Sequence, residues 1–287
     1  MATLREIKRR INSIKNTSKI TKAMKMVSAS KLRRHQNRLL QTRPYATRIE
    51  NVITHLSTAT EKEQFPLLQV RPRKVVEVLV ITADRGLCGA FNANIIKETN
   101  QVINNLKEGS FEYTLSVIGK KAMDYFKRRN VPLRKEWIGL SGAITYDEAI
   151  IIAKDFIEDY INGIFDELLI VYTEFESALV QRIMKKILFP ITHKDTSKVA
   201  QISEYTYEPS AEAIFHVILA RYIYTQFFRI LLESNTSEEA ARMVAMENAT
   251  KNAKDMIGNL TLQYNKVRQA VITKEMLDII GGAEALA

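Results

Sequence analysis

The sequence predicts an α/β protein that combines a long antiparallel two-helix coiled coil, formed by both termini, with a small Rossmann-like doubly wound domain. The first observation behind this prediction is where helix breakers fall. Residues 1–43 contain neither Gly nor Pro, and residues 210–287 contain no Pro, whereas residues 44–209 hold all six prolines and seven of the ten glycines. Because Pro and Gly interrupt helices, long helices are expected at both ends and short elements between them.

The second observation is the helical spacing of apolar residues near the N-terminus. Leu4, Ile7, Ile11 and Ile14 follow the alternating spacing of a coiled-coil heptad, which gives way to small and polar residues further on. We therefore expect one helix from about residue 3 to 57, with Pro44 as its only helix breaker. Residues 1–57 form the N-terminal coiled-coil segment, and 58–74 a linker.

The C-terminal segment, residues 210–287, shows the same helical pattern and predicts a second long helix. Neither helix can bury its apolar stripe alone, so antiparallel pairing is expected. If residue 57 lies opposite residue 210, Met1 lies opposite about residue 266, and the helix beyond has no partner within the chain. This lone tip keeps an apolar stripe to its end, formed by Ile272, Met276, Ile279, Ile280, Ala283 and Leu286.

The third observation is that strand and helix patterns alternate in the middle of the chain. "VVEVLVIT" (75–82), "YTLSVIG" (113–119) and "ELLIVYTEF" (167–175) are apolar runs typical of buried parallel strands. Helices are expected over 90–107, 120–129 and 145–163, and an edge strand within 179–191. This order predicts a doubly wound sheet over residues 75–195, with residues 196–209 as a linking segment.

Charge is distributed unevenly along the 287 residues. The chain carries a net charge of +10, yet residues 1–48 hold fourteen Lys and Arg against one acid, Glu6, and the remainder is slightly acidic. Such an excess indicates a solvated helix face, a nucleic-acid-binding arm or contact with an acidic protein surface. Residues 1–44 contain no aromatic ring for stacking on bases, which weighs against nucleic acid. The small residues of "KMVSASK" (25–31) suit close passage of another protein.

Several classes of function are disfavoured by what the sequence contains. The most apolar candidate for a membrane span, residues 216–232, is interrupted by Arg221 and Arg229, and the N-terminus lacks the apolar core of a signal peptide. A single cysteine, Cys88, excludes an internal disulfide and fits a reducing compartment. The four histidines are too scattered to predict a metal site, and no catalytic constellation is evident.

The segment "TADRGLCGAFN" (82–92) follows the first predicted strand and opens a helix. Gly86 and Gly89 could expose backbone N–H groups to a phosphate, which would suit a nucleotide-binding enzyme. The segment lacks the third glycine of a dinucleotide fingerprint and the Gly-Lys-Ser/Thr of a P-loop. A tight structural turn is therefore favoured, with Cys88 as a packed thiol in preference to a nucleophile.

Four segments resemble the gamma subunits of F-type ATP synthases, of bacterial type. They are "ITKAMKMVSASKLRR" (20–34), "DRGLCGAFN" (84–92), "ARMVAMENATKNA" (241–253) and "ITKEMLDIIGGAEAL" (272–286). The resemblance spans the chain, and it implies a central rotor shaft that couples rotation of a membrane c ring, driven by proton flow, to conformational cycling of catalytic beta subunits.

The resemblance also implies partners and a location. The expected partners are a hexamer of alpha and beta subunits, the epsilon subunit and the c-subunit ring, which places the chain peripherally at the cytoplasmic face of the cell membrane. Catalysis is expected on the beta subunits, and no catalytic residue, cofactor or metal on this chain. The alternative that the residues left open is a nucleic-acid-binding protein with a basic coiled-coil arm.

The same resemblance assigns contact residues. It implies that Met24 and Lys25 meet an acidic lever segment of beta and that Arg268 and Gln269 catch a loop of beta. It further implies that the apolar tip turns inside an apolar collar and that the segment "EYTYEPS" lies on the c ring. The tip residues are Met276, Ile279, Ile280 and Leu286, and the c-ring residues are Tyr205, Tyr207 and Glu208.

Overall fold

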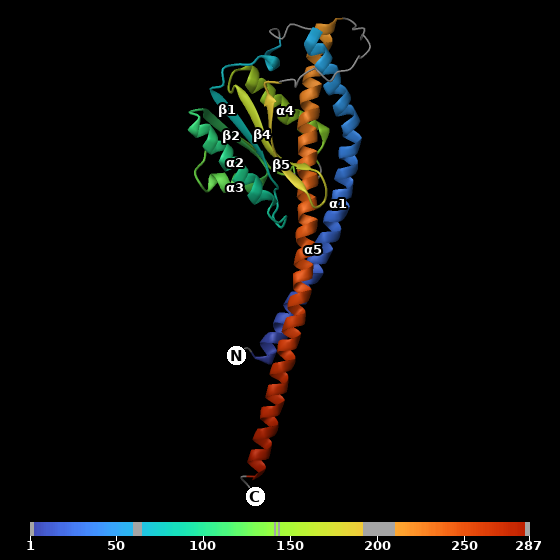
Figure 1. Ribbon diagram of the computed structural model, residues 1–287, viewed down its shortest axis with the longest axis vertical. Helices are drawn as coiled ribbons and strands as arrows, with labels where there is room; N and C mark the ends of the chain where they lie inside the picture. The colour runs from blue at the N-terminus through green and yellow to red at the C-terminus, as the bar shows by residue number, and fades with distance from the viewer. Residues whose placement is uncertain (1–2, 60–64, 141, 143, 192–209, 285–287) are drawn as a thin grey trace. The chain divides into compact units, whose positions relative to one another are not determined.

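The computed structural model describes residues 3–59, 65–140, 142, 144–191 and 210–284. Its elements alternate between helix and strand in the middle of the chain and are bounded by two long helices (Figure 1). In chain order they are α1 (Leu4–Ala59), η2 (Pro66–Leu68), β1 (Val75–Ile81), α2 (Phe91–Glu108), β2 (Glu112–Ile118), α3 (Lys120–Lys127), β3 (Lys135–Trp137), α4 (Tyr146–Ile161), β4 (Glu167–Phe175), β5 (Gln181–Phe189) and α5 (Ala211–Glu284).

The chain divides into two compact units. One unit comprises Met1–Ser28 with Arg242–Ala287, and the other comprises Ala29–Ala241. Both long helices contribute residues to each unit. The second unit holds every strand that the structure describes, and the first unit consists of the N-terminal part of α1 and the C-terminal part of α5.

The second unit is built around a five-stranded sheet with strand order β3-β2-β1-β4-β5. β1 pairs in parallel with both β2 and β4, β2 pairs in parallel with β3, and β5 runs antiparallel to β4 at the edge. The chain thus winds from β1 outward to β3 and returns through α4 to β4 on the opposite side of β1. This is the predicted doubly wound, Rossmann-like arrangement, extended by the short strand β3 that the sequence pattern did not predict.

Two separate apolar cores cover the two faces of this sheet. Side chains that alternate along β1 point to opposite faces, so that Leu79 joins one core and Val78 joins the other. The first core packs α4 and parts of α1 and α5 against the sheet, through residues such as Phe156 and Phe227, whose rings stack 5.7 Å apart. The second core packs α2 and α3 against the other face. Both faces are therefore buried, as parallel strands require.

The first unit is an antiparallel pair of helical segments. The Oγ1 atoms of Thr21 and Thr250 lie 2.8 Å apart, and Lys25 Nζ lies 2.6 Å from Glu247 Oε1, which fixes the register. In an antiparallel pair, a step toward the N-terminus of one helix corresponds to an equal step toward the C-terminus of the other. Thr3 lies eighteen residues before Thr21, so its partner position lies eighteen residues after Thr250, at about residue 268. The part of α5 beyond that position has no partner from the described part of α1. α5 itself continues through Gly281 and Gly282 to Glu284.

Candidate functional site

The buried seam of α1 changes character along its length. Ile7, Thr21, Ser28, His35 and Ile49 are all buried, and each lies at a multiple of seven residues from the others. This spacing marks one coiled-coil position, which normally carries a large apolar side chain. Only the outer members of the series are apolar here. This one heptad position therefore holds small and polar side chains in the middle of the helix, in line with the weakening of the heptad pattern after Ile14, although Leu32 and Leu39 are buried beside it.

The polar residues of the seam differ in their hydrogen bonding. In the first unit the hydroxyl of Thr250 donates to the carbonyl of Met246 at 2.7 Å and lies beside the hydroxyl of Thr21. His35, in the second unit, is 1% exposed, and neither ring nitrogen has a hydrogen-bond partner among the described residues. Burial lowers the pKa of His35, the cations Arg38, Lys31 and Arg34 lower it further, and Glu239 acts in the opposite direction.

The residues predicted to meet a lever of another subunit lie at the edge of this seam. Met24 and Lys25 are both half-buried, and Lys25 forms an ion pair with Glu247 of α5. The neighbouring Ile20, Met26 and Val27 are 61%, 60% and 57% exposed. Because Ile20 and Val27 are seven residues apart, they share one outward face of α1. These exposed apolar residues were not predicted from the sequence. For Ile20 and Val27 the signal was available, because each lies one residue before a seam residue, Thr21 or Ser28.

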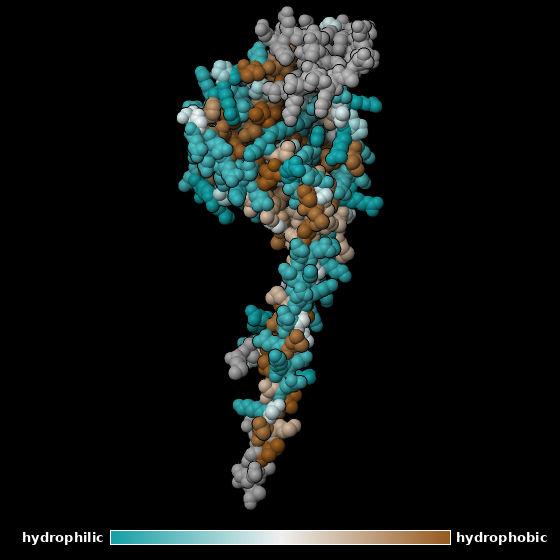
Figure 2. Space-filling view, in the orientation of Figure 1, coloured by the Kyte–Doolittle hydropathy of each residue, from teal (hydrophilic) through white to brown (hydrophobic). Residues whose placement is uncertain are grey.

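The C-terminal end of α5 carries the other predicted contact residues. Arg268 and Gln269 are exposed, and Met276, Ile279 and Ile280 are 58%, 72% and 55% exposed. Apolar side chains recur among polar ones along this end of the helix (Figure 2). Leu286 and the three predicted c-ring residues, Tyr205, Tyr207 and Glu208, lie outside the described residues.

The turn after β1 forms hydrogen bonds with the turns after β2 and β3. The carboxylate of Asp84 accepts hydrogen bonds from the backbone N–H groups of Lys120 at 2.9 Å and Gly139 at 3.1 Å, linking the turns that follow three strands. Asn92 accepts from the N–H of Ala83 at 2.9 Å and donates to the sulfur of Cys88 at 3.1 Å. Cys88 is buried. These contacts support the prediction of a structural turn.

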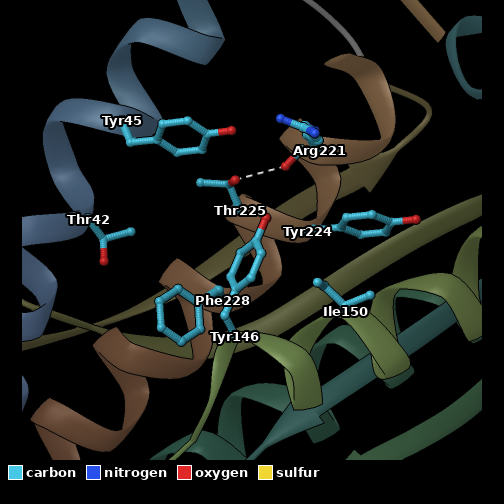
Figure 3. A pocket seen from close by; sticks show the side chains of 8 residues that line it. All are labelled: Thr42, Tyr45, Tyr146, Ile150, Arg221, Tyr224, Thr225 and Phe228. Atoms are coloured by element: carbon cyan, nitrogen blue, oxygen red, sulfur yellow. Dashed lines mark hydrogen bonds between the residues drawn. The ribbon is translucent and has the colours of Figure 1, made fainter. Parts of the chain in front are cut away.

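A cavity of about 520 Å³ lies between α1, α4 and α5 in the second unit (Figure 3). Its walls are largely aromatic, and the ring of Tyr146 meets that of Phe228 edge to face at 5.4 Å. The hydroxyl of Thr225 is occupied by a bond to the Arg221 carbonyl at 2.8 Å. The lining residues are Thr42, Tyr45, Tyr146, Ile150, Arg221, Tyr224, Thr225 and Phe228, among which there is no carboxylate, histidine or thiol for acid–base or nucleophilic chemistry.

The described part of the chain contains no cluster of His, Cys, Asp and Glu side chains that could hold a metal ion. Within the same residues, no helix is long and apolar enough to cross a membrane. Two exposed apolar features stand out on the long helices: the outward face of α1 that carries Ile20 and Val27, and the end of α5, which has no partner from the described part of α1.

The chain matches a known protein family over nearly its whole length. A family model described as ATP synthase matches residues 3–286. The chain is 46% identical to the ATP synthase gamma chain of Anaeromyxobacter sp. and 45% identical to that of Heliobacterium modesticaldum, in each case over 100% of both chains.

A solved structure of the same fold is the rotor of the mitochondrial ATP synthase from Euglena gracilis, in rotational state 1. It matches with a TM-score of 0.62 and 20% identity, over 94% of this chain and 98% of that one. The structural similarity to this rotor, given by the TM-score, supports the fold. The sequence identity to the bacterial relatives over their full length supports the family. The chain belongs to the ATP synthase gamma-chain family.

Proposed function

We propose that the chain is the central rotor shaft of an ATP synthase. In this role the long helices stand inside a hexamer of alpha and beta subunits, and the α/β domain contacts the epsilon subunit and the membrane c ring. The ring turns the shaft as protons flow, and the shaft moves each catalytic beta subunit through its conformations in turn. The chain itself is non-catalytic and sits at the cytoplasmic face of the cell membrane, attached only through the ring.

The observation that carries this proposal is the unpartnered apolar end of α5. An exposed apolar stripe on a lone helix has a high free energy in water, because each side chain that could be buried stays hydrated. A collar supplied by other chains removes this cost. A collar that surrounds the whole helix, without deep pockets for single side chains, would still let the helix turn.

The contact near residue 24 supports the same role. A lever that pushes on a turning helix needs contact without interlocking, and the small side chains of the half-buried Ala29 and the exposed Ser30 would allow such contact. The basic side chains of α1 attract an acidic lever at long range. In the free chain Lys25 is paired with Glu247, so the lever has to compete with that carboxylate for Lys25 or bind the exposed Ile20, Met26 and Val27.

In this proposal, rotation of the shaft is coupled to the conformation of each beta subunit because the shaft makes different contacts with different beta conformations. A rigid, asymmetric shaft presents a different side to each beta subunit, and it can shift their conformations only by the difference in its contact free energy between them. Met24 and Lys25 at the lever, Arg268 and Gln269 at a second loop of beta, and the tip are the proposed contact sites. The proposal also keeps Tyr205, Tyr207 and Glu208 at the c ring.

Co-expression with alpha and beta subunits tests the proposal. The three chains are expected to purify as one complex with ATPase activity, which alpha and beta without this chain lack. A chain that fails to enter such a complex, or a complex whose ATPase activity is the same without it, contradicts the shaft role.

A further inference from the structure

A cleft lies between α2 and α3. Its lining residues are remote in the sequence from the contact residues described above. The cleft has a volume of about 650 Å³, within the range of small-molecule sites. It runs along three turns of α2 and two turns of α3, on the hydrophilic flank of the α/β domain (Figure 2). Its lining residues are Asn92, Ala93, Ile96, Lys97, Asn100, Gln101, Asn104, Lys121, Asp124, Tyr125, Arg128 and Arg129.

The cleft carries a marked excess of positive charge. Lys97, Lys121, Arg128 and Arg129 face one carboxylate, Asp124, which leaves a net charge of +3 on the lining. No ion pair joins any of the four cations to a carboxylate within the part of the chain that the structure describes. Cations held close together on a folded surface repel one another, and a bound multivalent anion relieves that repulsion.

One of the cations is held in place by an aromatic ring. The guanidinium of Arg129 lies 3.7 Å from the centroid of the Tyr125 ring, and the Tyr125 hydroxyl accepts a hydrogen bond from the Asn100 amide at 2.9 Å. One guanidinium nitrogen, Nη1, donates to the Tyr125 carbonyl at 3.4 Å. The remaining N–H groups at the edge of a stacked guanidinium match the oxygens of a phosphate. The ring and the amide thus reduce the conformational entropy that Arg129 would lose on binding an anion.

The remaining donors suit phosphate. Arginine binds phosphate through two parallel N–H···O bonds and lysine binds it as a point charge, and both kinds of cation are present. The amides of Gln101 and Asn104 add neutral donors along α2. Near the other end of the cleft, a Cβ on Gly86 in the turn after β1 would lie 3.8 Å from Cε of Lys121.

We propose that this cleft binds a short polyphosphate anion, either free or carried by a nucleotide. The compact volume and the mixture of Arg, Lys and amide donors favour a small phosphate chain over an extended acidic peptide. None of the cleft's lining residues belongs to α1, to α5 or to the predicted c-ring segment. Through this cleft, phosphate compounds would bind directly to the α/β domain of the chain.

The test is isothermal titration of the full chain with tripolyphosphate at 0.15 M salt. The variant Lys121→Gln/Arg128→Gln/Arg129→Gln removes three cleft cations and is expected to weaken binding by about tenfold or more. The matched control, Lys8→Gln/Arg9→Gln/Lys15→Gln, removes three exposed cations of α1 and is expected to change affinity less than about twofold. Equal losses in the two variants, or no binding by the unmodified chain, would overturn the proposal.

A gain-of-affinity variant guards against effects of misfolding. Asp124→Asn removes the one carboxylate of the lining and is expected to tighten binding by about threefold, whereas Asp255→Asn, which makes the same change at an exposed position of α5, leaves it unchanged. Identical behaviour of the two variants would count against the site.

Parallel titrations identify the source of the phosphate. Tighter binding of ATP than of tripolyphosphate indicates that the nucleoside is also contacted, and equal binding indicates that the phosphate chain alone is recognised. Both results agree with the proposal. An octaglutamate peptide that binds more tightly than either, and loses affinity in the cleft variant, would show that the cleft takes an acidic peptide instead.

Discussion

Arg134 is the residue on which the charges inside the α/β domain converge. Its Nε donates to Glu77 Oε2 at 2.8 Å, and its Nη1 contacts Asp159. Its guanidinium also lies 5.7 Å from the ring centroid of Phe156 and 5.5 Å from that of Phe165. Glu77 is a carboxylate in the middle of β1 with no exposed surface. Burial would raise the pKa of Asp159, but hydrogen bonds from Lys135 and Arg134 outweigh this and lower it. These contacts join β1, the segment around β3, and α4.

Replacing Arg134 by Met is expected to destabilise the domain strongly. The substitution leaves the buried Glu77 carboxylate without its cation, which costs about 3–5 kcal/mol in the free energy of unfolding. The control is Lys127→Met, which breaks the exposed pair between Lys127 and Glu136 and should cost no more than about 1 kcal/mol. Urea-induced unfolding of the full chain measures both values, and similar losses in the two variants would contradict the role of Arg134.

His35 makes the stability of the helix pair depend on pH. The pKa of His35 in the folded chain lies below the ordinary value of 6.5 because of burial and three neighbouring cations, with Glu239 opposing. The unfolded chain therefore takes up a proton more readily. The stabilisation from the neutral ring is fully present above pH 6.5 and is lost as the pH falls through the folded-state pKa.

The variant His35→Leu should lack this part of the pH dependence. We expect the unmodified chain to lose more free energy of unfolding between pH 7.5 and pH 5.5 than the variant does. The reason is that a histidine at position 35 takes up a proton on unfolding in this range, whereas a leucine cannot. Urea titrations of both proteins at the two pH values give the comparison. Parallel losses would show that His35 is not the group responsible.

Met24 tests the proposed lever contact. Met24→Lys adds a cation to a basic stretch of α1 and should reduce ATP-driven proton pumping by the assembled complex more than it reduces assembly. Met256→Lys makes the same change at a 52% exposed position of α5, outside the predicted contact, and should leave pumping intact. Unchanged pumping in the Met24 variant would place the lever contact elsewhere.

At the scale of elements, the lone end of α5 is the most informative feature. We expect Ile279→Glu/Ile280→Glu to weaken assembly with alpha and beta by on the order of 2 kcal/mol or more, because two charges would enter an apolar collar. Thr261→Glu/Gln263→Glu adds the same charge at exposed positions of the same helix and serves as the control. Co-purification yields over a range of concentrations report the difference. If both variants assemble equally well, the collar is not apolar.

The sequence was sufficient to predict most elements because their signals are local. Apolar β-branched runs located β1, β2 and β4, and the helical spacing of apolar residues without any proline located α5. β3 was missed because "KEW" has three residues, two of them charged, and it is held by long-range hydrogen bonds such as Gly119 N–H to the Trp137 carbonyl at 2.8 Å. α3 ends at Lys127, earlier than expected, and the chain then turns at Asn130, whose φ is 55°.

Contacts between segments that are distant along the chain could not be predicted from the sequence. The heptad pattern showed that α1 has a partner, but the pairing of Lys25 with Glu247 depends on the register of two helices that are far apart in the chain. The ion pairs of Arg134 likewise depend on how the sheet brings β1 and α4 together. The cleft between α2 and α3 could not be predicted either, because its cations lie on α2, on α3 and just beyond the end of α3, and the tertiary fold decides the spacing of these segments.

At the scale of the whole molecule, the central claim is that the chain rotates within its partners. The most direct test attaches a fluorescent bead to a cysteine introduced at the exposed Lys107, since the native Cys88 is buried. With alpha and beta immobilised, ATP should drive stepwise rotation of the bead in a single direction, and rotation should stop when ATP is removed. A complex that hydrolyses ATP while the bead stays stationary would contradict the rotor role.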